Sequence, residues 1–132
     1  MHEIASYARN VFLKDHPVIT RRVMLSSTGT AQTLLAGSVI AEKTVTTTVS
    51  EQTTTTVTTG AYAKAGSGET VAMLGVLAED VVIPASGDAY ALVYIHAAVI
   101  ISALVWDDGV SATDQRAALI ELRKVGIFAV EA

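Results

Sequence analysis

Eighteen residues near the middle of the chain, KTVTTTVSEQTTTTVTTG at positions 43–60, include ten threonines. This composition suits either an extended, glycan-bearing stalk or a pair of β-strands, and the two alternatives lead to different folds. Threonine and valine favour strands because a branched Cβ packs well on a pleated surface. A mucin-like stalk is rich in proline, and this stretch contains none. We therefore predict two strands joined by the polar residues 50–52.

The connection within the stretch, Ser-Glu-Gln, lacks the Asn-Gly or glycine-rich sequence that a tight hairpin turn favours. A single extended strand and a flexible loop are therefore alternatives to the hairpin. In the hairpin, Val45, Thr47 and Val49 share one face of the first strand and Thr46 and Thr48 the other, because strand side chains alternate. The hairpin is expected to be ordered, with at least one face in solvent.

Size and composition place the chain among folded proteins of one domain. The 132 residues are enough for a modest core, and 51% hydrophobic against 17% charged residues is far from the composition of a disordered chain. The apolar excess suggests an oligomer or a docking partner. A net charge of −4 without any Lys/Arg run argues against nucleic-acid and anionic-membrane partners.

Two segments bear on membrane targeting. The first residues, MHEIASYARNVFLKDHP, have no apolar h-region, so no signal peptide is predicted. Residues 89–106, AYALVYIHAAVIISALVW, carry no formal charge and approach the minimum length of a transmembrane helix. They are rich in β-branched residues, contain His96 and Ser102, and are flanked by acidic rather than basic residues. We predict one or two buried strands here instead of a membrane span.

The remaining pattern predicts short strands and a single helix. Strands are expected at residues 18–25, at Val39 and Ile40, at 71–83 with a bend at Gly75, and at 127–130. Residues 111–126 predict the helix, in which Ser111 is the N-cap and Gly126 ends the last turn. Ala118, Leu119, Leu122 and Val125 recur at helical spacing and form its expected buried face.

Residues that could carry chemistry do not converge in the sequence. The histidines His2, His16 and His96 lack metal-ligand spacing, and the absence of cysteine excludes disulfides, thiolate zinc sites and cysteine nucleophiles. The acidic pairs Glu79–Asp80 and Asp107–Asp108 are adjacent residues, which point to opposite faces of a strand. No GxSxG motif or phosphate-binding loop is present. We predict no metal, no cofactor and no enzymatic activity.

Four segments, in order and at similar spacing, resemble the phage head decoration proteins of the lambda D-like family. They are LLAGSVIAE at 34–42, GSGETVAMLGVLAEDV at 66–81, PASGDAYALVYIHAAVIISALVW at 84–106 and ALIELRKVGIFAV at 118–130. The resemblance implies a mainly β fold with one short C-terminal helix, in which residues 1–25 form an N-terminal capsid-binding arm and first strand. Residues 26–132 then form a single β-rich decoration domain. The threonine-rich stretch departs from the family, because it replaces a short connection and is read as an inserted hairpin.

The resemblance also implies a structural virion protein that binds the outer surface of the mature, expanded phage capsid. Its partners are then the major capsid protein and two further copies of itself in a homotrimer at three-fold and quasi-three-fold positions, where it cements capsomers. For the arm, the expected capsid-binding residues are Pro17, Val18, Ile19, Thr20, Arg21, Arg22, Val23 and Leu25. The expected core or trimer contacts are Tyr94, His96, Val99, Ile101 and Trp106.

Two other classes of function remain as alternatives. One is a small trimeric β-barrel enzyme with its active site between subunits. The other is a carbohydrate- or host-binding surface module that uses Trp106 together with Tyr62, Tyr90 and Tyr94.

Overall fold

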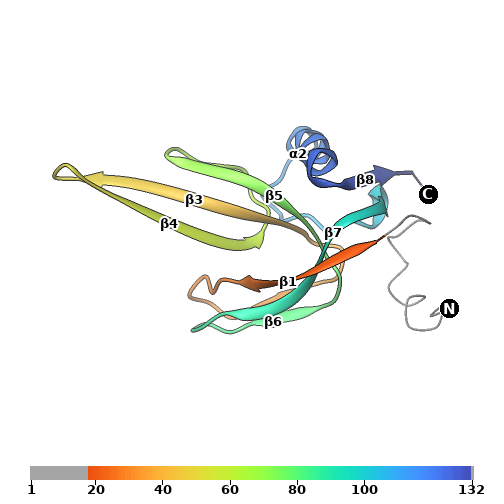
Figure 1. Cartoon of the computed structure of the whole chain (residues 1–132), viewed down its shortest axis with the longest axis horizontal. Helices are drawn as coiled ribbons and strands as arrows, with labels where there is room; N and C mark the ends of the chain where they lie inside the picture. The colour runs from red at the N-terminus through yellow and green to blue at the C-terminus, as the bar shows by residue number, and fades with distance from the viewer. Residues whose placement is uncertain (1–17, 132) are drawn as a thin grey trace.

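The computed structural model describes residues 18–131, which form a mainly β structure with one α-helix near its C-terminal end (Figure 1). The fold class predicted from the sequence is confirmed. The strands are β1 Ile19–Leu25, β2 Gln32–Leu34, β3 Val39–Val49, β4 Gln52–Ala61, β5 Glu69–Leu77, β6 Val81–Ile83, β7 Ala89–Ile100 and β8 Ile127–Val130. The 3-10 helix η1 spans Ile101–Ala103, and the α-helix α2 spans Ala112–Val125. Residues 1–16 and Pro17 of the expected arm lie outside the described residues.

The main sheet has the strand order β1-β7-β5-β3-β4, and all of these pairs are antiparallel. Strand β8 pairs in parallel with the end of β7, and β2 and β6 form a separate two-stranded ribbon. The first and last strands of the order also meet. The Ser26 amide donates to the Thr59 carbonyl at 2.8 Å, and the Thr59 amide donates to the Ser26 Oγ at 3.2 Å. These bonds curl the sheet towards a closed barrel.

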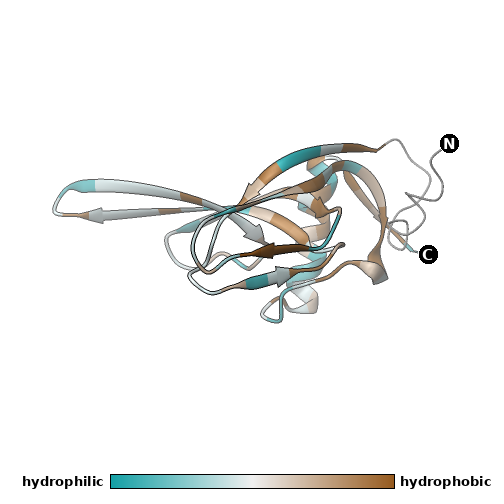
Figure 2. Ribbon diagram, turned by 90° about the horizontal axis from the view of Figure 1, so that it is seen from below, coloured by the Kyte–Doolittle hydropathy of each residue, from teal (hydrophilic) through white to brown (hydrophobic). Residues whose placement is uncertain are grey.

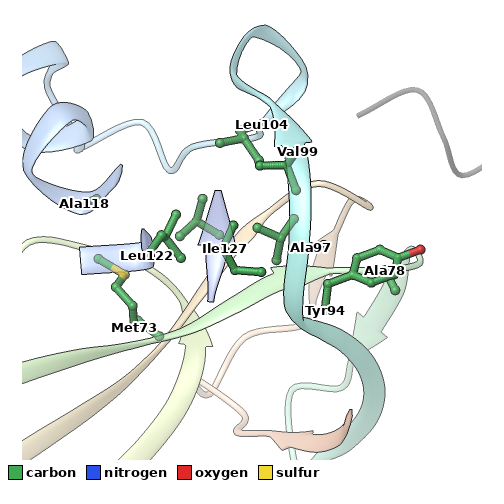
Figure 3. Packing of buried hydrophobic residues seen from close by; sticks show 12 residues of the cluster. Met73, Ala78, Tyr94, Ala97, Val99, Leu104, Ala118, Leu122 and Ile127 are labelled. Carbon is green, nitrogen blue, oxygen red and sulfur yellow. The ribbon is translucent and has the colours of Figure 1, made fainter. Parts of the chain in front are cut away.

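Both faces of the sheet are covered, so the chain has two hydrophobic cores. Helix α2 and strand β8 cover one face, where Leu122 and Ile127 pack against Met73 and Ala97 (Figure 3). The β2–β6 ribbon covers the other face, where a second cluster contains Leu25, Leu34, Ile40, Leu77, Ile83, Ala91 and Val93. The two covers explain why several strands read as nearly continuous apolar runs and not as strict alternations.

Strand β7 supplies alternate side chains to both cores, and its register with β1 shifts once. Ile19 pairs with His96 while Thr20 pairs with Tyr94, which leaves Ile95 as an extra residue opposite β1. Such a bulge reverses the alternation of side chains beyond it. Tyr94 before the bulge and Ala97 after it consequently pack in the same core. The uncharged run at 89–106 is thus one long strand followed by η1, as its β-branched composition indicated. No helix within residues 18–131 is long and apolar enough to cross a membrane.

A second bulge lies on β5, where an irregularity at Gly75 was predicted. Ile40 pairs with Gly75 and Ala41 with Met73, which leaves Leu74 unpaired. Gly75 is buried against β7, and a Cβ built there would overlap the carbonyl oxygen of Tyr94. Glycine is therefore required by the close approach of two backbones.

The single strand predicted at residues 71–83 is wrong in one respect, because the structure divides it into β5 and β6. The chain turns at residues 78–80, where the Asp80 carboxylate accepts a hydrogen bond of 2.8 Å from the Ala36 amide. The turn allows β6 to leave the main sheet and pair with β2. Neither three-residue strand was predicted as part of such a ribbon.

The predicted hairpin in the threonine-rich stretch is confirmed as β3 and β4, with Val49 paired to Gln52 next to the turn. The connection is two residues long instead of three. Ser50 and Glu51 both have positive φ, 50° and 67°, as a type I′ turn requires. The short strand expected at Val39 and Ile40 and the first threonine strand form one continuous element. The right-handed twist of the two strands thus imposes the primed turn even without glycine.

The outer part of this hairpin projects beyond the body of the molecule (Figure 1). Strand β5 accompanies β3 only as far as Val45, and every residue from Thr46 to Val57 is exposed. The ribbon is pale over much of its length in Figure 2, since threonine lies near the middle of the hydropathy scale. Both faces of the ribbon are therefore in solvent, and cross-strand pairs such as Thr46 with Thr55 stabilise it.

Helix α2 begins and ends where the sequence predicts. The Ser111 Oγ accepts a hydrogen bond of 3.2 Å from the Asp114 amide, and Gly126 has a φ of 115°. The buried residues of the helix are Ala118 and Leu122, whereas Val125 is 43% exposed. Its apolar face is narrower than predicted, since β8 follows directly and takes over the packing.

The hairpin predicts that proline disrupts the structure at Thr47 but is tolerated at the neighbouring Thr48. Val49 and Gln52 flank the two-residue turn and form a hydrogen-bonded pair, and such pairs alternate with non-hydrogen-bonded pairs along the hairpin. The Thr47 amide therefore points to β4, and the Thr48 amide points away from it. We expect Thr47→Pro to accelerate amide exchange across the hairpin by at least about tenfold and to lower the melting temperature. Thr48→Pro is the matched control. Unchanged exchange and melting temperature in Thr47→Pro would contradict the pairing.

The backbone contact at Gly75 predicts a large loss of stability on adding one methyl group. We expect Gly75→Ala to lower the free energy of unfolding by more than about 2 kcal/mol, because β5 and β7 must separate to admit it. Gly60→Ala is the control, since no atom lies within 4 Å of a Cβ at that position. Denaturant unfolding of both variants measures the difference, and equal stabilities would refute the close approach.

Candidate functional site

The outer edge of β1 presents unpaired backbone groups. The Leu92 carbonyl accepts a hydrogen bond from the amide of Ala78, the residue that follows β5. The amide and carbonyl groups of Leu92 therefore point towards β5 and away from β1. Its β1 partner, Arg22, consequently has its own amide and carbonyl directed away from β7. Because backbone groups alternate in direction along a strand, the amide and carbonyl groups of Thr20 and Met24 also point away from β7. In the described part of the chain, β1 forms strand pairs with β7 alone.

The side chains on β1 are also largely exposed. Val18, Ile19 and Met24 are 43%, 54% and 46% exposed, and the Arg22 guanidinium lies 4.7 Å from the centroid of the Tyr90 ring. Thr20, Arg21 and Arg22 are exposed as well, and Val23 is half-buried. Leu25 differs from the other expected arm residues because it is fully buried in the second core. The surface that β1 offers to a partner is therefore residues 18–24.

The five residues expected at the core or trimer contact fall into different environments. Tyr94 and Val99 are buried inside the chain, and His96 and Trp106 are half-buried. Their rings meet other aromatic rings edge to face, His96 with Phe128 at 5.8 Å and Trp106 with Tyr62 at 6.4 Å between centroids. Ile101 is 37% exposed. Of this set, Ile101 has the largest exposed fraction.

Sequence reasoning missed the exposed Met24, and it named the exposed Tyr90 only for the carbohydrate-binding alternative. Met24 and Tyr90 are cross-strand partners on β1 and β7, and Tyr90 is 59% exposed. Strand alternation could have found Met24, because it is two residues from Arg22 and shares its face. Val130, which pairs with Ile100 and is 36% exposed, was likewise not singled out.

Several carboxylates in the described residues bond to loop amides or lysines. Asp80 accepts from Ala36, Asp88 accepts from the Ser27 amide at 3.2 Å, and Asp114 lies 3.6 Å from the Lys64 Nζ. Within residues 18–131, no three His, Cys, Asp or Glu side chains gather as a metal site would require. These three carboxylates lie in separate parts of the chain, two of them in loops and Asp114 in the first turn of α2.

A groove of about 460 Å³ lies at the base of the hairpin, between β3, β4 and the loop after β1. Its lining is mostly serine, threonine and alanine, and its charged residues are Lys43 and Asp107. The Lys43 Nζ is 3.6 Å from the Glu69 Oε2 and so is already paired. The buried position of Tyr94 prevents it from stacking on a sugar beside the other tyrosines.

Glu69 closes the loop between β4 and β5. Its Oε1 accepts a hydrogen bond of 2.8 Å from the Gly66 amide, and its Oε2 faces Lys43. The Gly66 hydrogen bond is the main cause that holds the pKa of the Glu69 carboxyl below its ordinary range. Desolvation opposes this effect, and the Lys43 ammonium adds to it. Burial and the Asp114 charge raise the pKa of the Tyr62 phenol next to this loop.

These features define a class of protein that acts through its surfaces, with free strand edges and exposed apolar side chains but no convergent reactive groups in its described part. Residues 2–127 match the family described as bacteriophage lambda head decoration protein D, and the chain belongs to that family. The match confirms the resemblance found in the sequence. Comparison with curated proteins and with solved structures found no match. The chain is thus a structural, capsid-associated protein of a phage virion.

The contacts of Glu69 predict an acid-dependent opening of the loop at residues 62–68. A carboxyl whose pKa is lowered by folding stabilises the folded loop above its unfolded pKa, and this contribution is lost as pH falls through the folded pKa. We expect the Gly66 amide resonance to titrate below the ordinary glutamate range. Glu69→Gln should abolish that titration, whereas Glu51→Gln at the hairpin turn should leave it unchanged. A Gly66 amide that ignores pH in the wild type would contradict the contact.

Proposed function

We propose that this protein binds the outer surface of the mature, expanded phage head and cements neighbouring capsomers as a homotrimer at three-fold and quasi-three-fold positions. Membership of the decoration-protein family supports the location. The observation that carries the mode of attachment is the free outer edge of β1, with its exposed residues Val18, Ile19 and Met24.

The proposed attachment is β-augmentation by a strand of the major capsid protein. The outward amide and carbonyl groups of Thr20, Arg22 and Met24 supply a ladder, and the alternate side chains supply the fit. Residues 1–17 precede β1 in the sequence and are included in the proposed arm. Each contact of this kind is modest, but three arms on one trimer bind as a unit and raise the overall affinity.

Cementing then follows from mass action. A protein that binds the expanded shell and not its separated capsomers stabilises the shell in proportion to its binding free energy. The function requires well-placed contact area and no reactive group.

The trimer contact is proposed at the end of β7, with η1 and β8. Ile101 and Val130 lie there, and both are exposed apolar residues close to the pairing of Ile100 with Val130. A partner at this position accounts for part of the apolar excess of the chain. The core residues Tyr94 and Val99 then act indirectly, by holding β7 in place.

Co-sedimentation with undecorated, expanded heads of the source phage tests the function. We expect saturable binding and heads that survive higher temperature, and we expect deletion of residues 1–20 to abolish both. Full binding after the deletion would refute the arm, and a well-folded protein that never binds expanded heads would refute the function.

A proline on β1 tests the edge without shortening the chain. Arg22→Pro removes an amide that points away from β7, so the fold is expected to persist while head binding falls at least about tenfold. Arg22→Ala removes the same contact with Tyr90 but keeps the amide, and is the matched control. Equal head binding by the two variants would exclude β-augmentation at this edge.

A further inference from the structure

The outer edge of β4 is a second free backbone edge, at the opposite end of the sheet order from β1. Since Val49 and Gln52 close the turn, alternate residues from Thr53 onward direct their amide and carbonyl groups away from β3. Thr59 belongs to this series, and its outward groups bond to Ser26. Thr53, Thr55 and Val57 form the free part of the edge, because no other strand within residues 18–131 pairs with β4 there.

This edge lacks the devices that natural proteins use against strand association. Residues 52–59 contain no proline, lysine or other charged residue, and all of them lie in one regular register with β3. Exposed edges are normally blunted by such charges, by prolines or by bulges. The positive-φ turn at Ser50 and Glu51 also holds the ribbon extended into solvent, where a partner can reach it.

We propose that the free edge of β4 pairs antiparallel with the same edge of a second copy of this chain, about a two-fold axis at Thr55. In this register Thr55 faces Thr55 of the partner subunit. Thr53 of each copy faces Val57 of the other copy. Each of the three outward-facing positions on one copy then meets an outward-facing position on the other. The pairing ends at Thr59, where Ser26 already occupies the edge.

Charge and side-chain type select a second copy as the occupant. The ribbon from Thr44 to Thr59 carries one charge, Glu51, which the two-fold register places opposite Thr59 and not opposite another acid. An oppositely charged partner strand would gain little from so neutral an edge. Threonine facing threonine is already the pairing inside the hairpin, at Thr46 with Thr55, Thr47 with Thr54 and Thr48 with Thr53. A two-fold contact also reuses one patch on both copies.

The contact is distinct from the proposed trimer contact and from the β1 edge. The hairpin projects away from the end of the molecule where β1 begins and β8 ends (Figure 1). It does not depend on capsid attachment, so it can be tested on the purified full-length protein. On a decorated shell, it would join neighbouring decoration units directly.

A single introduced cysteine tests the register, because the chain has no cysteine of its own. Directly opposed residues of this kind have Cα atoms about 5.5 Å apart, within the range of a disulfide. We expect oxidised Thr55→Cys to give a covalent pair of chains at high yield. Thr54→Cys is the matched control, since its side chain lies on the other face and is not opposite itself. Equal yields from both variants, or none from Thr55→Cys, would overturn the register.

Charge exchange tests the self-pairing independently of disulfide chemistry. Sedimentation of the wild type is expected to show a rise in mass with concentration that comes from this pairing. Thr55→Lys and Thr55→Glu each place like charges opposite each other on the axis, so each variant alone should lose that rise. An equimolar mixture should regain it. Unchanged hairpin amide exchange verifies that both variants fold. If the wild type shows no such rise, or if the mixture fails to regain it, a second copy is not the occupant of the edge.

Discussion

Strand β7 is bonded to β1, β5 and β8, so three other strands are held in place through it. Its alternate side chains serve the core under α2 and the core under the β2–β6 ribbon. The extra residue Ile95 shifts which positions face the α2 core, from Leu92 and Tyr94 before it to Ala97 and Val99 after it. The strand is accommodated by Gly75 on β5 and by Gly126 after α2, both of which lie where a Cβ would meet the backbone of β7. Two glycines thus allow close packing on the strand that organises the fold.

The sequence was informative wherever local propensity and tertiary structure agreed. The branched residues of β3 and β4 predicted a hairpin, and Ser111 and Gly126 predicted both ends of the helix. The β2–β6 ribbon was missed because a three-residue strand has no detectable periodicity. The turn at Ser50 and Glu51 carries no glycine, since the pairing of eleven- and ten-residue strands overrides the local preference of the turn.

The functional surface was less predictable than the fold. The sequence located the β1 strand correctly but could not separate the buried Leu25 from the exposed Met24, because that depends on which face the β2–β6 ribbon covers. Likewise, the sequence does not separate core residues from trimer-contact residues among the five named in and after β7. The structure distinguishes the buried Tyr94 from the exposed Ile101. Alternation specifies two faces of a strand, but only the packing of distant segments decides which face is buried.

The antiparallel pairing of β1 with β7 has a mechanical consequence. The seven residues of β1 run alongside β7, and their hydrogen bonds lie across the strand direction. A pull applied to the start of β1 along its own axis loads all of these bonds together, in shear, and does not peel them apart one at a time. The Ser26–Thr59 bonds anchor the far end of the strand to β4. A tether attached at this edge would therefore resist a sudden outward force from an internally pressurised container better than the number of its bonds alone suggests.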